Sequence, residues 1–326
     1  MMAAACFAGG TAAFGQTFAV DRIDNPALAL GNMVSAPTGD TVFRIDPDTG
    51  EVTRLSGTGT RMSAAAARAM ITVRCSKGGK ALLCNSERAS VQIGAVGSAT
   101  GRARSLANLT VAAGTAAVSA PKKGGNPLHF TLGPLGEGGS ATFYVGADFA
   151  IAGDNSGLPT GTSAAEFYVT ISRADGSGAS TASGIAQALV RRPITLTAVS
   201  DLRFGAVTLP SSGTGRVIIS PADGTRSVEG TGVRMLPSQS GAARFTVSGE
   251  GGQAFSVTVP STFEMKTNGG SITVTTAHNA GSARTLAGKA GSAGTAAFNV
   301  GGSFPLAPGT RAGVYAGTFE VSVQYN

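Results

Sequence analysis

The sequence contains no tryptophan, only two histidines and few charged residues, which make up 13% of its 326 residues. Glycine is abundant instead, with 48 residues, and Ser, Thr and Val are frequent. This composition disfavours helical bundles and is typical of short strands joined by many turns. The hydrophobic fraction of 42% is sufficient for two modest cores. We therefore expect an all-β chain of two domains rather than a disordered chain.

The sequence also lacks the motifs of common enzyme classes. No Gly-x-Ser-x-Gly elbow stands between a strand and a helix, and no phosphate-binding loop or metal-ligand cluster occurs. His129 and His278 lie in strand-like surroundings and are interpreted as surface or packing residues. Acids such as Asp148, Glu166 and Glu264 cannot be paired into a glycosidase dyad from the sequence. We expect no enzyme, with no catalytic site, metal site or cofactor.

The net charge of +7 does not indicate a nucleic-acid partner. Lysine and arginine are scattered singly along the expected strands, with few aromatic residues beside them. Nucleic-acid binding needs a concentrated basic patch. We therefore expect an ordinary basic surface and no nucleic-acid binding.

The N-terminus indicates export. Residues 1–15 (MMAAACFAGGTAAFG) are uncharged, apolar and rich in small side chains, and Ala13-Phe14-Gly15 before Gln16 resembles a signal-peptide cleavage site. The usual positive residues before the apolar run are missing, which suggests a truncated start; a flexible or buried N-terminal segment is the alternative. No other stretch approaches the roughly 18 apolar residues of a membrane helix. We expect passage through the periplasm to the cell surface or the exterior.

Two of the three cysteines are expected to form a disulfide. Cys6 lies in the expected signal peptide, whereas Cys75 and Cys84 flank a Gly78-Gly79 turn that would fold two strands back on each other. Alternation along these strands would bring the two thiols face to face, and an oxidising compartment would join them. Two free buried thiols are the alternative. A metal site is disfavoured because no further Cys or nearby His completes a ligand set.

The two halves of the chain repeat each other. The motif at residues 28–31 (LALG) corresponds to that at 202–205 (LRFG), 46–50 (DPDTG) to 220–224 (SPADG), and 57–61 (GTGTR) to 230–234 (GTGVR). Residues 143–151 (FYVGADFAI) likewise correspond to 298–306 (FNVGGSFPL), and 167–171 (FYVTI) to 319–323 (FEVSV). Each half therefore has roughly seven to nine short strands spaced by turns, the pattern of an immunoglobulin-like sandwich.

The repeat divides the chain into four segments. We predict a signal peptide at 1–15, a first β-sandwich at 16–176, a linker or donor strand at 177–192 and a second β-sandwich at 193–326. Ile185, Gln187 and Leu189 are the candidate donor-strand residues, which would complete the first sandwich from within the same chain. Residues 114–138 are the least repetitive stretch, and if the first sandwich carries a ligand site that the second lacks, this is where we would expect it.

The second half resembles the bacterial family catalogued as domain of unknown function 4402. The matching motifs are residues 193–196 (PITL), 202–205 (LRFG), 230–232 (GTG), 300–302 (VGG) and the closing run 313–325. That run also resembles the C-terminal strand of chaperone–usher pilins and spore-coat-U-like subunits, and its characteristic residues are Gly313, Tyr315, Gly317, Phe319, Val321, Val323 and Tyr325. The first half shares these motifs more loosely, because Leu30 replaces Phe204 and the penultimate tyrosine is lost.

The resemblance implies a secreted structural subunit of a bacterial surface fibre, or fimbria. Pilin-like domains are sandwiches without a final strand, which a periplasmic chaperone and then a neighbouring fibre subunit supplies by strand addition, with an outer-membrane usher as a further partner. The sequence stops at Asn326, one residue after an alternating strand, so we expect at least one sandwich with an open edge. A complete sandwich that ends on its last strand is the alternative.

The resemblance also suggests a place in the fibre. Cleavage near Gln16 would leave some dozen residues before the motif at 28–31, too few for a long donor extension. A subunit that accepts a strand but donates none would lie at the tip, as a two-domain adhesin that contacts a surface receptor or glycan. The alternative function is a monomeric secreted binding module, for instance a glycan binder.

Overall fold

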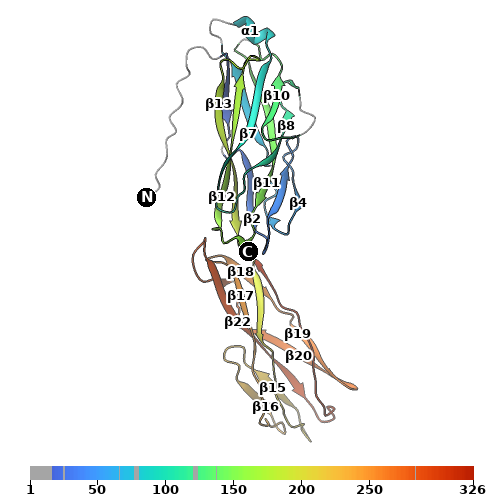
Figure 1. Ribbon diagram of the computed structural model, residues 1–326. Helices are drawn as coiled ribbons and strands as arrows, with labels where there is room; N and C mark the ends of the chain where they lie inside the picture. The colour runs from blue at the N-terminus through green and yellow to red at the C-terminus, as the bar shows by residue number, and fades with distance from the viewer. Residues whose placement is uncertain are drawn as a thin grey trace. The chain divides into compact units, whose positions relative to one another are not determined.

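The computed structural model is almost entirely β, which confirms the predicted fold class (Figure 1). It describes residues 17–24, 26–65, 67–76, 81–119, 124–136, 138–282 and 284–326. The predicted signal peptide and the Gly78-Gly79 turn lie outside these residues. The chain forms two units, Met1–Arg191 and Arg192–Asn326, each with its own contacts. Within the described residues, neither helical segment has the length and apolarity needed to cross a bilayer.

The first unit is a sandwich of two sheets. One sheet has the strand order β1 (Phe18–Ile23), β6 (Ala69–Cys75), β11 (Ser140–Ile151), β3 (Thr41–Ile45) and β4 (Val52–Ser56), and β8 (Ala107–Ala113) also pairs with β11. The other has the order β5 (Thr60–Arg61), β2 (Leu28–Val34), β13 (Ser180–Arg191), β12 (Gly161–Ser172), β7 (Ala89–Thr100), β10 (Leu128–Leu132) and β9 (Val118–Ser119). Their inner faces meet in one continuous hydrophobic core.

The second unit has a similar strand order with fewer strands. Its larger sheet runs β14 (Thr195–Ser200), β17 (Ala243–Glu250), β22 (Ala293–Leu306), β15 (Gly215–Ile219) and β16 (Arg226–Gly230). The strand β20 (Gly270–His278) pairs with both β22 and β19 (Thr262–Thr267). The smaller sheet has only three strands, β21 (Arg284–Thr285), β18 (Ala254–Thr258) and β23 (Ser322–Tyr325).

The repeated turn motif builds the same backbone structure in both units. In the first unit, the Gly50 N–H donates to the Asp46 carbonyl over 2.9 Å, and in the second the Gly224 N–H donates to the Ser220 carbonyl over 2.9 Å. Both glycines have positive φ, 76° at Gly50 and 77° at Gly224, a conformation that other residues adopt at a cost. Positions 46–50 and 220–224 are therefore structurally equivalent.

A second pair of glycines aligns the long strands β11 and β22. A Cβ atom on Gly146 would lie 2.1 Å from the Ile45 carbonyl oxygen, and one on Gly301 would lie 2.2 Å from the Ile219 carbonyl oxygen. Only glycine permits this close approach of the turn to the strand. The equivalence of positions 146 and 301 extends the alignment of the two units across the sheet.

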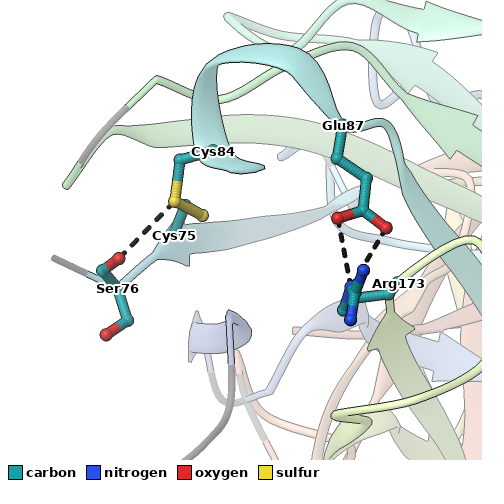
Figure 2. The surroundings of a disulfide bond; sticks show 5 residues. All are labelled: Cys75, Ser76, Cys84, Glu87 and Arg173. Atoms are coloured by element: carbon teal, nitrogen blue, oxygen red, sulfur yellow. Dashed lines mark hydrogen bonds and ion pairs between the residues drawn. A yellow bond between two sulfur atoms is a disulfide. The ribbon is translucent and has the colours of Figure 1, made fainter. Parts of the chain in front are cut away.

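The predicted disulfide joins Cys75 to Cys84, but not across a hairpin (Figure 2). Cys75 ends β6, whereas Cys84 lies in the short helix α1 (Ala81–Ser86), so the predicted return strand is wrong. Alanine and leucine in this segment favour helix over strand, and only two alternating positions supported the strand. The adjacent Arg173 donates from Nε to both carboxylate oxygens of Glu87 over 3.1 Å.

Candidate functional site

Residues 180–191, which the sequence left as a linker or a donor strand, form β13 inside the first unit. The strand lies between β12 and β2 in the sheet. It runs antiparallel to β12, from the pair Gly161–Val190 to the pair Ile171–Ser180, and parallel to β2. The edges of β12 and β2 that face each other are therefore both covered by this one strand.

The predicted donor residues lie on the outer face of β13. Ile185 and Gln187 are half-buried and Leu189 is 41% exposed, whereas Ala186 and Ala188 on the alternate face are buried in the core. The core face holds small side chains because the space is already filled: a Cβ atom on Gly184 would lie 2.4 Å from Cζ of Phe167. The side chains that enter the core from β13 are therefore those that alternate with the three candidate residues, as the period of two along a strand requires.

The second unit has no strand in the position that corresponds to β13. Its strand β23 pairs with β18 along one edge, from Phe255–Tyr325 to Thr258–Ser322, as β12 pairs with β7. Residues 202–208, the counterpart of β2, form only two isolated bridges, Arg203–Gly241 and Val207–Met235. Among residues 192–282 and 284–326, no strand lies between these two segments.

Equivalent side chains of the two units differ in burial as a missing strand would require. Phe167, Val169 and Ile171 on β12 are all fully buried. Their counterparts in the repeat, Phe319, Val321 and Val323, are only half-buried. The same holds for the motif at 28–31, where Leu28 and Leu30 are fully buried while Leu202 is half-buried and Phe204 retains 7% exposure.

The core of the second unit is divided where the first unit has one continuous core. One cluster surrounds Phe204 and Phe304, whose rings meet edge to face with centroids 4.8 Å apart. The other surrounds Phe255 and Phe298. Leu202 packs against both clusters without being buried in either. A strand between residues 202–208 and β23 would lie over the boundary between the two clusters.

An apolar groove with a volume of about 490 Å³ opens over the cluster around Phe204 and Phe304, with Leu202 at its edge toward the other cluster. Its side chains are mostly aliphatic or aromatic, and only Arg203 and Arg311 among them are charged. Val314, which also lines the groove, is 88% exposed. The apolar residues that line it are Leu202, Phe204, Val207, Leu209, Met265, Ile272, Phe304, Leu306, Val314 and Tyr315.

The predicted C-terminal strand is shorter than the run of alternating residues suggested. Only Ser322–Tyr325 form β23, and upstream a single bridge joins Ala316 to Lys266. Gly317 passes so close to β19 that a Cβ atom there would lie 2.2 Å from the Glu264 carbonyl oxygen. Of this run, Gly313, Val314 and Tyr315 line the groove, whereas Phe319, Val321, Val323 and Tyr325 pack against the second core cluster.

The penultimate residue, Tyr325, connects β23 to the start of the second unit through hydrogen bonds. The Tyr325 hydroxyl donates to the Arg192 carbonyl over 3.0 Å and accepts from the Glu250 N–H over 2.7 Å. Glu250 is buried and accepts from the backbone N–H of Gly291 and of Arg192. These bonds hold β23 beside the N-terminal segment of the unit, so its unpaired edge stays in place.

The sequence analysis did not identify most of the groove. Met265 and Ile272 lie on β19 and β20, whose alternating pattern indicated strands without indicating an uncovered side. Leu209 and Leu306 adjoin turns, where sequence periodicity carries little information. Residues 114–138, expected to hold a ligand site, contribute β9 and β10 at one edge of the second sheet, while residues 120–123 and 137 lie outside the described part.

Comparisons with known proteins agree with the resemblance seen in the second half. Residues 194–325 match the family model described as Domain of unknown function (DUF4402), which confirms the predicted family for the second unit. No curated protein matches the chain.

Among solved structures, the chain is similar to one from a chaperone–tip adhesin complex of CFA/I fimbriae biogenesis, with 10% identity, coverage of 94% of this chain and 98% of that chain, and a TM-score of 0.25. It is also similar to one from the CsuC–CsuE chaperone–tip adhesion subunit pre-assembly complex of Acinetobacter baumannii, with 9% identity, 94% and 99% coverage and a TM-score of 0.25. A mutant of the CFA/I adhesin CfaE of enterotoxigenic E. coli matches with 12% identity, 91% and 92% coverage and a TM-score of 0.23.

Proposed function

We propose that this chain, which carries a DUF4402 domain at residues 194–325, is an exported subunit of a bacterial surface fibre. In this proposal its second unit is completed by a strand from a partner. The observation that carries the proposal is the position of β13, which is filled in the first unit and has no counterpart in the second. A protein chain added there would pair with β23 on one side and with residues 202–208 on the other.

Strand addition is favoured at this place by both backbone and side chains. An unpaired strand edge offers N–H and C=O groups to a new strand, and alternate side chains of that strand can enter apolar pockets. Phe319, Val321 and Val323 would pass from half-buried to buried, as their counterparts on β12 already are. Complete burial of such a side chain contributes about 1.5–3 kcal/mol relative to full exposure. Burial of these side chains is what a partner strand would add to the second unit.

The partners that fit this groove are a periplasmic chaperone and, after it, a neighbouring fibre subunit, with an outer-membrane usher at the site of assembly. The disulfide between Cys75 and Cys84 is in keeping with export to an oxidising compartment. The first unit, which has its closing strand from the same chain, would be displayed at the tip as an adhesin. Ile185, Gln187 and Leu189 then lie on the solvent face of an in-chain donor strand.

The proposal is tested by expressing the full chain in a periplasm with and without its chaperone, followed by size-exclusion chromatography. We expect recovery as a complex with the chaperone, or polymers once the chaperone is removed. A stable monomer without any chaperone would contradict the open groove and favour a secreted binding module. In that case binding of glycans by the region of residues 114–138 would be measured next.

Two exposed apolar residues provide a control for this experiment. Val314 lines the groove and is 88% exposed, whereas Leu55 is 46% exposed and lies on β4 of the first unit. Because neither side chain is part of the buried core, Val314→Asp and Leu55→Asp should both fold. We expect Val314→Asp to weaken the chaperone complex and Leu55→Asp to leave it intact. Equal effects of the two variants would place the contact elsewhere.

A further inference from the structure

The second unit has another cavity, on the outer face of its larger sheet, with a volume of about 800 Å³. Its floor includes Asn299 of β22 and Arg244 of β17, which form a register pair. Asn299 stands between the buried residues Phe298 and Val300 and therefore faces away from the core. The walls are the turn at residues 222–224 and the segments 198–203 and 239–242, and none of the lining side chains is aromatic.

In the first unit the equivalent place is filled by an arginine. The Arg68 guanidinium carbon lies 3.7 Å from the centroid of the Tyr144 ring. Its Nη1 donates to the carbonyl oxygens of Pro47, over 3.2 Å, and of Asp48. Hydrogen bonds from Thr49 and Asp48, together with the charge of Arg68, lower the pKa of the Asp46 carboxyl. The turn of the first unit thus holds a carboxylate beside a cation supplied by the same chain.

The register of the two units shows which substitutions open the cavity. Ala69 pairs with Val145 in the first unit, and Ala243 pairs with Val300 in the second. Arg68 and Ala242 each precede the aligned alanine of their unit, so they occupy equivalent positions. Tyr144 and Asn299 each precede the aligned valine and are likewise equivalent. The second unit therefore has neither the guanidinium nor the ring on which it lies. The Asn299 side chain donates from Nδ2 to the Pro221 carbonyl over 3.1 Å, so of the two turn carbonyls only that of residue 222 is left to a guest.

The turn of the second unit carries its carboxylate at a different position, because Asp223 aligns with Thr49 whereas Ser220 aligns with Asp46. Hydrogen bonds from Thr225 and from Ser220 lower the pKa of Asp223 to about 2, so it is ionised at neutral pH. In the part of the chain that the structure describes, no lysine or arginine forms an ion pair with Asp223, whereas Arg203 on the same cavity wall already bonds to Asp201 and Gln239.

We propose that this cavity receives an arginine side chain from a protein partner. The guest guanidinium would lie near the place that Arg68 occupies in the first unit, with Asp223 as its counter-ion and the carbonyl of residue 222 as a further acceptor. Guanidinium suits this site because it presents several planar donors to grouped oxygens. Arg244 on the floor repels the guest guanidinium, so binding depends on Asp223, the lining carboxylate that is not paired with Arg203. This binding does not depend on strand addition in the groove.

The direct test uses small probes and the full chain. N-acetyl-arginine methylamide is titrated against isotope-labelled protein, and N-acetyl-citrulline methylamide, which has the same shape without the charge, is the control. We expect the arginine probe to shift the amide resonances of Asp223, Gly224 and Asn299, and the citrulline probe to bind much more weakly. Equal binding of the two probes, or shifts elsewhere, would overturn the proposal and indicate a site for neutral polar ligands.

Two variants sharpen the result. Asp223→Asn should weaken binding of the arginine probe about twofold to fivefold, as expected for an exposed ion pair. The matched control is Asp175→Asn, because Asp175 likewise accepts hydrogen bonds within an exposed turn but lies in the first unit. Ala242→Arg should restore the arrangement of the first unit, raise the melting temperature and abolish probe binding. Probe binding that survives Ala242→Arg, or that is insensitive to Asp223→Asn, would contradict the assignment.

Discussion

Phe167 and Phe319 occupy equivalent positions of the two units but differ in their surroundings. Phe167 is fully buried in a continuous core, whereas Phe319 is half-buried and lies beside Phe263, with ring centroids 5.0 Å apart. The energetic value of a side chain depends on how much of it leaves water and on the cavity left when it is removed. The same residue type should therefore contribute unequally in the two units.

The first prediction concerns these two phenylalanines. Phe167→Ala should destabilise the first unit by about 3–5 kcal/mol, the usual cost for a buried phenylalanine. Phe319→Ala should cost clearly less in the free chain, and more once a partner strand covers the groove. Urea unfolding of both variants, free and in the chaperone complex, measures these differences. Equal costs in the free chain would mean that the groove is already closed in solution.

The second prediction concerns the pH dependence of Asp223. Hydrogen bonds from Thr225 and Ser220 lower the pKa of the Asp223 carboxyl from its ordinary value of 3.8 to about 2. Because the folded pKa is below the unfolded pKa, this group stabilises the fold above about pH 4, and the contribution is lost as the pH falls toward 2. Asp223→Asn should flatten the acid limb of the stability curve between these values, measured by urea unfolding at several pH values. An unchanged limb would show that the turn does not hold the carboxylate in this way.

At the scale of elements, the first unit is completed by β13, and the described part of the second unit has no equivalent strand. The strand lies in the middle of its sheet, with Ala188 buried and Leu189 exposed, although the side chains of Ile185 and Leu189 are the larger apolar ones. The small core face follows from the crowding beneath it, where Phe167 fills the space below Gly184. The outer face can carry leucine because scattered apolar residues are common on protein surfaces.

The third prediction tests which face of β13 is inside. Ala188→Asp would bury an unpaired charge and should unfold or strongly destabilise the first unit. Leu189→Asp, one residue further on, should change the free energy of unfolding by less than about 1 kcal/mol. Urea unfolding of the two variants compares them directly. A larger loss of stability in Leu189→Asp than in Ala188→Asp would mean that Leu189, and not Ala188, faces the core.

The sequence predicted the repeats and the turns correctly, but it did not show which side chains of β13 enter the core. The motif at 46–50 and its counterpart at 220–224 predicted equivalent turns because proline, aspartate and glycine each favour turn geometry for a local reason. The disulfide was predicted from two cysteines, but its second partner lies in a helix. The inward face of β13 depends on Phe167 in a neighbouring strand. The sequence of β13 alone does not show where the Phe167 ring lies.

The groove could be predicted only in outline. The alternating run ending at Tyr325 predicted a strand with an uncovered edge, and β23 is such a strand. The residues that fill the rest of the lining, such as Met265 and Leu306, come together from separate strands and turns. Their exposure is a consequence of a strand that is missing, and a missing strand is visible only when the two units are compared.

At the scale of the whole molecule, the two units should differ in stability. The first has a continuous core, a disulfide and a closed sheet, whereas the second has a divided core and half-buried apolar side chains along its open groove. Local stability in proteins follows such differences in burial and contact density. A partner that binds only the folded second unit raises the stability of that unit by mass action.

The fourth prediction follows from this asymmetry. In the free chain, amide hydrogens of β18 and β23 should exchange through openings of lower free energy than those of β7 and β12, their counterparts in the first unit. Binding of a chaperone should slow exchange in β23 and in residues 202–208 and leave β12 unchanged, because β13 already covers β12. Hydrogen exchange measured by mass spectrometry, with and without the chaperone, gives both comparisons in one experiment. If β23 were as protected as β12 without any partner, the second unit would be complete by itself and the groove would need another explanation.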